Sequence, residues 1–438
     1  MQQRLGRAVL LFAAAFLAAA PARAQANFTT YVALGDSLTA GFSNGALVRS
    51  HQLKSYPALL AQQAGVATFE QPLISQPGTP TELTLVTLTP PVIAAKAADR
   101  GAPLRLDLAR AYNNLGVPGA SVGDLLTRVT DGGGFHDIIL RGRGTALAQG
   151  IGLRPTTVTL WIGSNDVLPA ALSGRAIDGV TLTPVSSFRT SFQSVVTALK
   201  ASGATVYVAN VPDVASIPFV NTIQPVVVSP ATGAPVRVNG QTVPLLGPNG
   251  PLPANSLVTL AAAPLLLKGD GVPTTLGGSG RPLPDEVILD LNEVAVIRER
   301  VASYNLIISE ISQAAGFAVL DINAFFTDVA AHGRMIGGVT LTSAFLSGGL
   351  FGYDGVHPTD LGYALIANEF IRLINAHGGQ LEEVNLGPYL GVEPAPAAAA
   401  TAQSTPRFVQ AGGRAPWTAF TADVYETLKV AFPLLHRP

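Results

Sequence analysis

The sequence predicts an α/β fold in which helices cover both faces of a parallel sheet. Short apolar runs recur along the chain, as at Thr30–Leu34 and at Thr157–Ile162, the second of which is β-branched. Longer segments with apolar residues at helical spacing lie between such runs, most clearly Glu293–Ala314. Polar or glycine-rich fragments follow directly after two of the runs. Regular alternation of strands and helices favours a parallel sheet with helices on each side.

Each element rests on its own pattern. The expected strands are Thr30–Leu34, Ala111–Leu115, Thr157–Ile162, Thr205–Val211 and Phe317–Asp321. The expected helices are Ser187–Ala201, Glu293–Ala314 and a segment that begins at Asp360, directly after Pro358. In the second of these helices one face is apolar and carries Val294, Ile297, Val301, Tyr304, Ile308 and Ile311.

Two long insertions, 50–105 and 212–288, interrupt this alternation. Both are apolar and rich in Pro and Gly, and the second contains the hairpin signals Asn239-Gly240 and Asn249-Gly250. Structureless loops of this length are uncommon in compact domains. We therefore expect small subdomains or lids beside a site, with packing inserts remote from the site as the alternative.

The first 24 residues have the pattern of a secretory signal peptide. Arg4 and Arg7 make a basic start, residues 8–20 are apolar, and Ala22-Arg23-Ala24 is a cleavage site of the A-x-A kind. The apolar core is too short for a membrane anchor. The sequence thus predicts a secreted or periplasmic bacterial protein whose mature chain begins after Ala24.

The C-terminal part, 377–438, is expected to be a tail outside the main domain, 25–376. Its Pro394–Ala400 stretch is a linker rich in Ala and Pro. Beyond the linker, apolar residues at helical spacing predict a helix that docks on the core: Trp417, Phe420, Val424, Leu428 and Phe432. A transient contact with a membrane surface or a partner is the alternative use of this helix.

Composition limits the classes of function. The chain has 438 residues, 48% of them hydrophobic and 13% charged, and a formal net charge of -1. Nucleic-acid binding would require a basic surface, which this balance does not provide. No segment after the first 24 residues is long and apolar enough to span a membrane. With no cysteine, the chain has neither disulfides nor a cysteine for lipid attachment.

A serine follows the first expected strand in the fragment Gly35-Asp36-Ser37-Leu38. Serine is a poor nucleophile at neutral pH and requires a base within hydrogen-bond distance. Asp354 and His357 supply a carboxylate and an imidazole that can meet across one turn. The carboxylate would fix the tautomer of the imidazole and stabilise the imidazolium that forms when it takes the serine proton.

Acyl transfer also needs donors for the negative charge that develops on the carbonyl oxygen. Asn165 follows the strand Thr157–Ile162 and offers a side-chain amide, and the glycines of the turn 113–121 offer backbone N–H groups. Ligand sites in open α/β sheets lie beyond the carboxyl ends of the strands. These fragments can therefore converge on one site.

Taken together and in this order, the four fragments resemble the SGNH (GDSL-type) hydrolases, a family of esterases and lipases. The resemblance implies a three-layer α/β/α flavodoxin-like sandwich over 25–376. It implies Ser37 as nucleophile and His357 as a base oriented by Asp354. The implied oxyanion donors are the Ser37 backbone N–H, Gly119 and Asn165, and no cofactor or metal is implied.

Alternatives remain open at several of these residues. Gly116 could replace Gly119, although the family's glycine follows an asparagine as Gly119 follows Asn114. Ser121 lies in a G-x-S-x-G fragment, the nucleophile elbow of α/β-hydrolases, but Pro118 makes a preceding central strand unfavourable. Asp36 and Ser37 could form an ordinary turn. A metal site would need more His, Cys or carboxylate ligands than the pair formed by residues 354 and 357.

The remaining histidines are expected to have no comparable carboxylate partner; they are His51, His136, His332, His377 and His436. The predicted function is a secreted serine ester hydrolase that acts on small-molecule or lipid esters through an acyl-enzyme. The alternatives are a carbohydrate O-acetyl esterase on the same fold and a non-catalytic protein that binds lipid or glycan. The sequence leaves the acyl length, the alcohol and the oligomeric state open.

Overall fold

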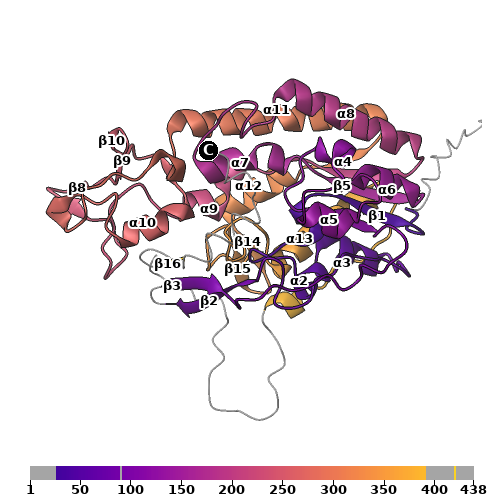
Figure 1. Ribbon diagram of the computed structural model, residues 1–438, viewed down its shortest axis with the longest axis horizontal. Helices are drawn as coiled ribbons and strands as arrows, with labels where there is room; N and C mark the ends of the chain where they lie inside the picture. The colour runs from indigo at the N-terminus through magenta and orange to yellow at the C-terminus, as the bar shows by residue number, and fades with distance from the viewer. Residues whose placement is uncertain (1–25, 89–90, 391–418, 421–438) are drawn as a thin grey trace, which may run out of the picture.

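A parallel sheet of five strands forms the centre of the computed structural model, which describes residues 26–88, 91–390 and 419–420 (Figure 1). Its strands are β1 (Tyr31–Gly35), β4 (Asn114–Gly116), β5 (Thr157–Trp161), β6 (Thr205–Ala209) and β13 (Ala318–Leu320). All five predicted strands are confirmed, with shifts of at most three residues at their ends.

The strand order is β4-β1-β5-β6-β13, which is the flavodoxin-like order that the resemblance implied. From β1 the chain first crosses to one side of the sheet, to β4, and then returns to the other side, to β5. In such sheets ligands bind where the order reverses, outside the carboxyl ends of the strands. Gly35, the last residue of β1, is in register with both Gly116 and Trp161. The loops that follow these three strands therefore begin side by side.

Alternate strand residues pack against helices on opposite faces of the sheet, as the pleat requires. Val32 and Leu34 face the layer of α8 (Val185–Ala201) and α11 (Leu291–Ala315), whereas Tyr31 and Ala33 face α3 (Tyr56–Gln63) and α13 (Asp360–Ala376). Figure 1 shows these two layers above and below the sheet. The three-layer prediction is thus confirmed.

The long helix α11 begins where its sequence satisfies the free backbone N–H groups of its first turn. The Asp290 side chain accepts hydrogen bonds from the N–H groups of Asn292 and Glu293, and the Glu293 carboxylate accepts one from the Asp290 N–H. This capping box places the start of the helix two residues before the predicted one, at Leu291.

The range 50–105 is an insertion only in part. Its first half contains α3, which covers the sheet and makes the crossover that parallel strands such as β1 and β4 need. Only the second half adds a separate unit, the antiparallel pair of β2 (Leu83–Leu88) and β3 (Pro91–Ala95). The prediction that the whole range interrupts the core is therefore corrected.

The second insertion, 212–288, forms short hairpins at one end of the molecule (Figure 1). Asn239 and Gly240 have φ values of 50° and 79° and connect β7 (Arg237–Val238) to β8 (Gln241–Thr242). Two positive φ values in a two-residue loop fit a type I′ turn, which confirms the first hairpin signal. The second hairpin turns at residues 248–249, one residue before the predicted position.

The remaining α-helices and β-strands of the described chain follow here with their bounds. They are α1 (Ser37–Ala40), α2 (Arg49–Gln52), α4 (Asp124–Thr127), α5 (Phe135–Leu140), α6 (Ala146–Gly152), α7 (Leu168–Ser173), α9 (Pro218–Asn221), α10 (Ala263–Leu267), α12 (Ile322–His332), β9 (Leu246–Gly247), β10 (Gly250–Pro251), β11 (Leu257–Val258), β12 (Ile288–Leu289), β14 (Arg334–Ile336), β15 (Val339–Leu341) and β16 (Ala419–Phe420). Within the described ranges, no helix combines the length and the hydropathy that crossing a bilayer requires.

Strand β16 corrects the expected helix in the tail. Ala419 and Phe420 form a strand that pairs in parallel with β3, so the helical interpretation is wrong at these two residues. The pairing joins the tail to the β2–β3 unit. The predicted signal peptide and the Pro394–Ala400 linker lie outside the described residues.

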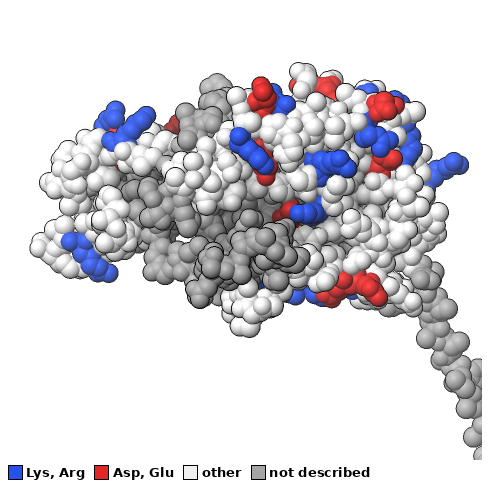
Figure 2. Space-filling view, turned by 90° about the horizontal axis from the view of Figure 1, so that it is seen from below, with Lys and Arg blue, Asp and Glu red and all other residues white. Residues whose placement is uncertain are grey.

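Charged side chains of both signs are interspersed on the face shown in Figure 2. The end of the molecule that carries the hairpins of the second insertion is mostly uncharged in this view. Among the described residues drawn on that face, charges of one sign do not form a broad patch of the kind that attracts a polyanion.

Candidate active site

Ser37 opens helix α1 at the carboxyl end of β1, where Asp36 is the N-cap residue. The Asp36 carboxylate accepts a hydrogen bond of 2.9 Å from the Leu38 N–H, which satisfies one free donor of the first turn. Burial raises the pKa of Asp36 to about 7. Strand β4 packs closely against this turn, and residue 116 at its end is glycine. Any larger residue would clash, because a Cβ there would lie 2.4 Å from the Ala40 nitrogen.

Asp354 and His357 form a buried pair in the loop before α13. The His357 Nδ1 lies 2.8 Å from Asp354 Oδ2, which also accepts a hydrogen bond from the Gly45 N–H. Asp354 Oδ1 accepts hydrogen bonds from the N–H groups of Val356 and His357. Burial alone would raise the pKa of Asp354, but His357 and these donors keep it below its usual value. A carboxylate held in this way orients the imidazole.

Asn165 lies in a short 3-10 turn (Ser164–Asp166) that follows β5. Its Nδ2 donates a hydrogen bond of 3.0 Å to the Ala120 carbonyl. A side-chain amide has two hydrogens on this nitrogen, so one remains for a ligand. The bond to Ala120 also links the Asn165 loop to the turn that contains Gly119.

The two candidate glycines, Gly116 and Gly119, differ in their environment. The Gly116 N–H donates to the Asn114 side chain at 3.0 Å, so it is already used within β4. Gly119 has a φ of 81°, a value that favours glycine, and among the described residues no heavy atom outside its chain neighbours lies within 4 Å of the position of a Cβ. The surroundings of this turn are therefore open.

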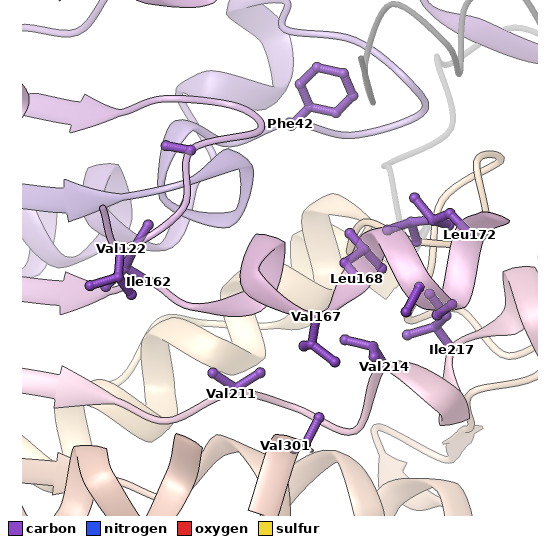
Figure 3. Close-up of a cluster of buried hydrophobic side chains, with 14 of the residues drawn as sticks. Phe42, Val122, Ile162, Val167, Leu168, Leu172, Val211, Val214, Ile217 and Val301 are labelled. Atoms are coloured by element: carbon purple, nitrogen blue, oxygen red, sulfur yellow. The ribbon is translucent and has the colours of Figure 1, made fainter. Parts of the chain in front are cut away.

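Ser37, Asn165 and His357 line one pocket of about 560 Å³, part of it open to solvent. Its wall is mainly apolar and includes Leu38, Leu168, Val214, Ile217, Phe326, Phe351 and Val356. Figure 3 shows Leu168, Val214 and Ile217 converging from α7 and the segment after β6. Gly119 lines a neighbouring cleft that shares Asn165 and Leu168 with this pocket. The structure thus gathers the predicted site residues at one edge of the sheet.

Ser121, the alternative nucleophile, has a different environment. Its hydroxyl and its backbone N–H both bond to the same oxygen of Asp124, each at 2.8 Å. It lies in the turn before α4 and does not follow a strand directly. These contacts are those of a residue that caps a turn.

The prediction about the other histidines is wrong for three of them. His51 lies between Asp360 and Glu82, with Nδ1 at 2.5 Å from one carboxylate and Nε2 at 2.8 Å from the other. His136 pairs with Asp131, and His332 pairs with Asp328. The His332 pair could be read from its i,i+4 helical spacing, whereas Asp360 is 309 residues from His51.

The His51 cluster adjoins the loop that carries Asp354 and His357. Asp360 is in the first turn of α13, three residues after His357, and Glu82 precedes β2. Burial alone would lower the pKa of His51, but its bonds to the two carboxylates raise it to about 9. For Glu82 the directions are reversed: burial alone would raise its pKa, but His51 and Lys96 lower it to about 2. The cluster therefore joins the β2–β3 unit to the start of α13 through ionised groups.

Comparison with protein families adds a decisive match, because the model of the GDSL-like lipase/acylhydrolase family covers residues 31–370. The chain belongs to this family. The matched range includes all five strands of the parallel sheet and the loop that carries His357. Membership in the GDSL-like acylhydrolases implies carboxylic ester hydrolysis.

Among solved structures, two enzymes are similar to this GDSL-family chain. An acetylxylan esterase from Geobacillus stearothermophilus is 13% identical, with 81% of this chain and 95% of that one covered and a TM-score of 0.38. A lipase/acylhydrolase from Enterococcus faecalis is 14% identical, with 62% and 76% covered and a TM-score of 0.27. These likenesses carry no argument about the substrate. No curated protein sequence matches the chain.

This GDSL-family protein is expected to lose stability as the pH rises and the His51 side chain gives up its proton. A histidine whose pKa is raised to about 9 on folding stabilises fully below its unfolded pKa of about 6.5 and loses that stabilisation as the pH passes through 9. We expect the wild type to lose on the order of 2–3 kcal/mol more than His51→Gln between pH 6 and pH 9.5.

Urea unfolding at the two pH values measures this difference. The exposed His332 is the matched control, because it also pairs with a carboxylate at 2.9 Å but in solvent. His332→Gln should behave like the wild type. Equal losses in wild type and His51→Gln would show that His51 is not charged in the folded protein.

Proposed function

We propose that this protein is a secreted serine ester hydrolase that cleaves acyl esters through an acyl-enzyme on Ser37. The observation that carries the proposal is the common pocket of Ser37, Asn165 and His357, with His357 backed by the buried Asp354 at 2.8 Å. A nucleophile, a base with its orienting carboxylate, and an amide donor are the groups that acyl transfer requires.

The reaction runs in two halves. Ser37 Oγ bonds to the ester carbonyl carbon while its proton passes to His357 Nε2, and the carbonyl oxygen becomes an oxyanion that accepts hydrogen bonds from the Asn165 amide and the N–H groups of Ser37 and Gly119. The C–O bond to the alcohol then breaks, and His357 returns the proton to the leaving oxygen. Water, deprotonated by His357, releases the acid and restores the serine hydroxyl.

The apolar wall supports a preference for acyl groups longer than acetyl. Burial of each methylene contributes about 0.8 kcal/mol, so a chain that extends along the wall gains affinity with length. Of the insertion 212–288, only residues within 212–217 line the pocket in the described structure. The proposal that this insertion shapes the acyl site is therefore limited to its first six residues.

Replacing Phe326 with alanine is expected to weaken the preference for long acyl chains. Its ring lines the pocket and packs against Phe351, with 5.8 Å between centroids. We expect kcat/KM for octanoyl ester to fall about tenfold, since two methylenes of lost contact correspond to about 1.6 kcal/mol, while acetyl ester hydrolysis changes little. A panel of nitrophenyl esters from acetyl to octanoyl measures the profile.

Phe325 supplies the control for this experiment. It precedes Phe326 in α12, with ring centroids 5.2 Å apart, but it does not line the pocket. Phe325→Ala should leave the chain-length profile unchanged. A wild-type profile that favours acetyl esters, together with turnover of acetylated xylan, would instead support the carbohydrate O-acetyl esterase.

Export is part of the same proposal and rests on the sequence alone. Residues 1–24 have the basic start, apolar core and A-x-A exit of a cleavable signal. Sequencing the N-terminus of the protein from a bacterial host's periplasm or medium tests it. A mature chain beginning at Gln25 supports export, and retention of the uncleaved chain in the cytoplasm contradicts it.

A further inference from the structure

A second, larger cleft adjoins the apolar pocket at Asn165 and Leu168. It has a volume of about 2030 Å³, part of it open to solvent, and Gly119 and Asn165 lie on its lining. Because Asn165 also lines the apolar pocket, an ester carbonyl bound at this residue adjoins both clefts. The two parts of an ester, acyl and alcohol, can then occupy different clefts.

The lining of the larger cleft is much more polar than the wall of the acyl pocket. Charged and hydroxyl side chains contribute to it, including Ser121, Asp124, Arg128 and His136. Asp124 joins two of these groups, with Arg128 Nε at 3.0 Å and the Ser121 hydroxyl at 2.8 Å. Apolar side chains such as Leu172 also line this cleft, so its lining is mixed, and a hydrocarbon chain that filled it would cover polar groups that need hydrogen bonds.

His136 is the built feature of this cleft. Its ring is buried, with only 4% of the side chain exposed, and its Nδ1 lies 3.0 Å from Asp131 Oδ2. Asp131 is itself held by the N–H groups of Gly134 and His136, at 2.8 and 3.0 Å. The orientation of the imidazole is thus fixed by α5 and the turn before it.

The second ring nitrogen of His136 lacks a partner in the described structure. Nε2 is buried and has no hydrogen-bond partner among the described residues, an arrangement that native proteins rarely tolerate. With Nδ1 bonded to the carboxylate, Nε2 accepts a hydrogen bond in the neutral ring and donates one in the protonated ring. A hydroxyl group can serve as partner in both cases, because it donates and accepts.

From these observations we infer that the larger cleft is the alcohol subsite and that His136 binds a hydroxyl of a polyhydroxylated alcohol. The inference rests on the proposed esterase function and adds the class of the alcohol, a glycerol or a sugar. His357 needs to reach only the ester oxygen, which is bonded directly to the carbonyl carbon. The rest of the alcohol is therefore free to extend past Gly119 into the polar cleft.

Three butyrate esters that differ only in the alcohol test the inference: those of glycerol, methyl glucopyranoside and propanol. The full chain is compared with His136→Phe, which keeps an aromatic ring but removes both nitrogens. We expect kcat/KM for the polyol esters to fall about tenfold, as loss of one hydrogen bond implies, and propyl butyrate hydrolysis to change less than twofold. The larger loss among the two polyol esters identifies glycerol or sugar as the preferred alcohol.

Two further variants separate binding from structure. His136→Gln places an amide near the position of Nε2 and should retain most of the polyol preference. His332→Phe removes an exposed histidine that also pairs with an aspartate and that lines neither cleft, so all three esters should be hydrolysed as by the wild type. Equal changes on all three esters, or none, in folded His136→Phe would overturn the inference while the esterase function stands.

A measurement on the unaltered protein covers the case in which His136→Phe does not fold. Free methyl glucopyranoside or glycerol should then inhibit propyl butyrate hydrolysis competitively, and lack of inhibition by both overturns the inference. A wild type that hydrolyses none of the three esters would contradict the esterase function itself. If only the alcohol subsite is wrong, the wild type still hydrolyses these esters.

Discussion

Ser37→Ala is expected to lower kcat by about three or more orders of magnitude, as loss of a triad serine does. The serine opens α1 at the end of β1 and lines the pocket that it shares with His357. Without its hydroxyl no acyl-enzyme forms, and only the oxyanion donors and substrate binding remain to promote hydrolysis by water. Single-turnover and steady-state hydrolysis of a nitrophenyl ester measure the loss.

Ser121→Ala is the matched control, since Ser121 lies in the fragment Gly119–Gly123 that fits the elbow of another hydrolase class. Its hydroxyl is bonded to Asp124 at 2.8 Å, so its removal should leave most of the activity. Strong loss of activity in Ser121→Ala, with activity kept in Ser37→Ala, would overturn the assignment of the nucleophile.

Asn165→Ala is expected to lower kcat about 10²–10³-fold, with little change in KM. One hydrogen of its amide is used by the Ala120 carbonyl at 3.0 Å, which fixes the side chain so that the other can meet the oxyanion. A donor held in place before the reaction stabilises charge that exists only in the transition state. The effect therefore falls on turnover and not on binding of the neutral ester.

Asn210 provides a control with the same chemistry and burial. It follows β6 as Asn165 follows β5, and both are 8% exposed. Its side chain bonds to Asp321 and to the Asn323 N–H, and it does not line the pocket. Asn210→Ala should keep the wild-type kcat even if stability falls. A raised KM with unchanged kcat in Asn165→Ala would mean that Asn165 only positions the substrate.

The sequence was sufficient for the parts of the fold that depend on local patterns. The run before Asp36 is apolar and the run before Gly163 is apolar and β-branched, and each is followed by a glycine or a capping side chain that ends the strand. The Asp354–His357 pair was predictable because its partners are three residues apart. These features need no knowledge of distant contacts.

Features that depend on distant contacts were missed. The His51 cluster joins residues 309 positions apart, and none of its members has an unusual sequence neighbourhood. Helix α3 was assigned to an insertion because its surroundings are rich in Pro and Gly, although it covers the sheet. Ala419–Phe420 pairs with β3 in the absence of any local strand pattern. Tertiary pairing decides such cases.

The most direct test of the account is to identify the residue that a fluorophosphonate modifies in the full chain. Such a probe phosphonylates a serine whose hydroxyl is activated by a base, and peptide mass spectrometry locates it. We expect the label on Ser37, and we expect it to be lost in His357→Ala, because His357 activates the hydroxyl. A label on Ser121, or no label on folded protein that is active on esters, would contradict the central claim.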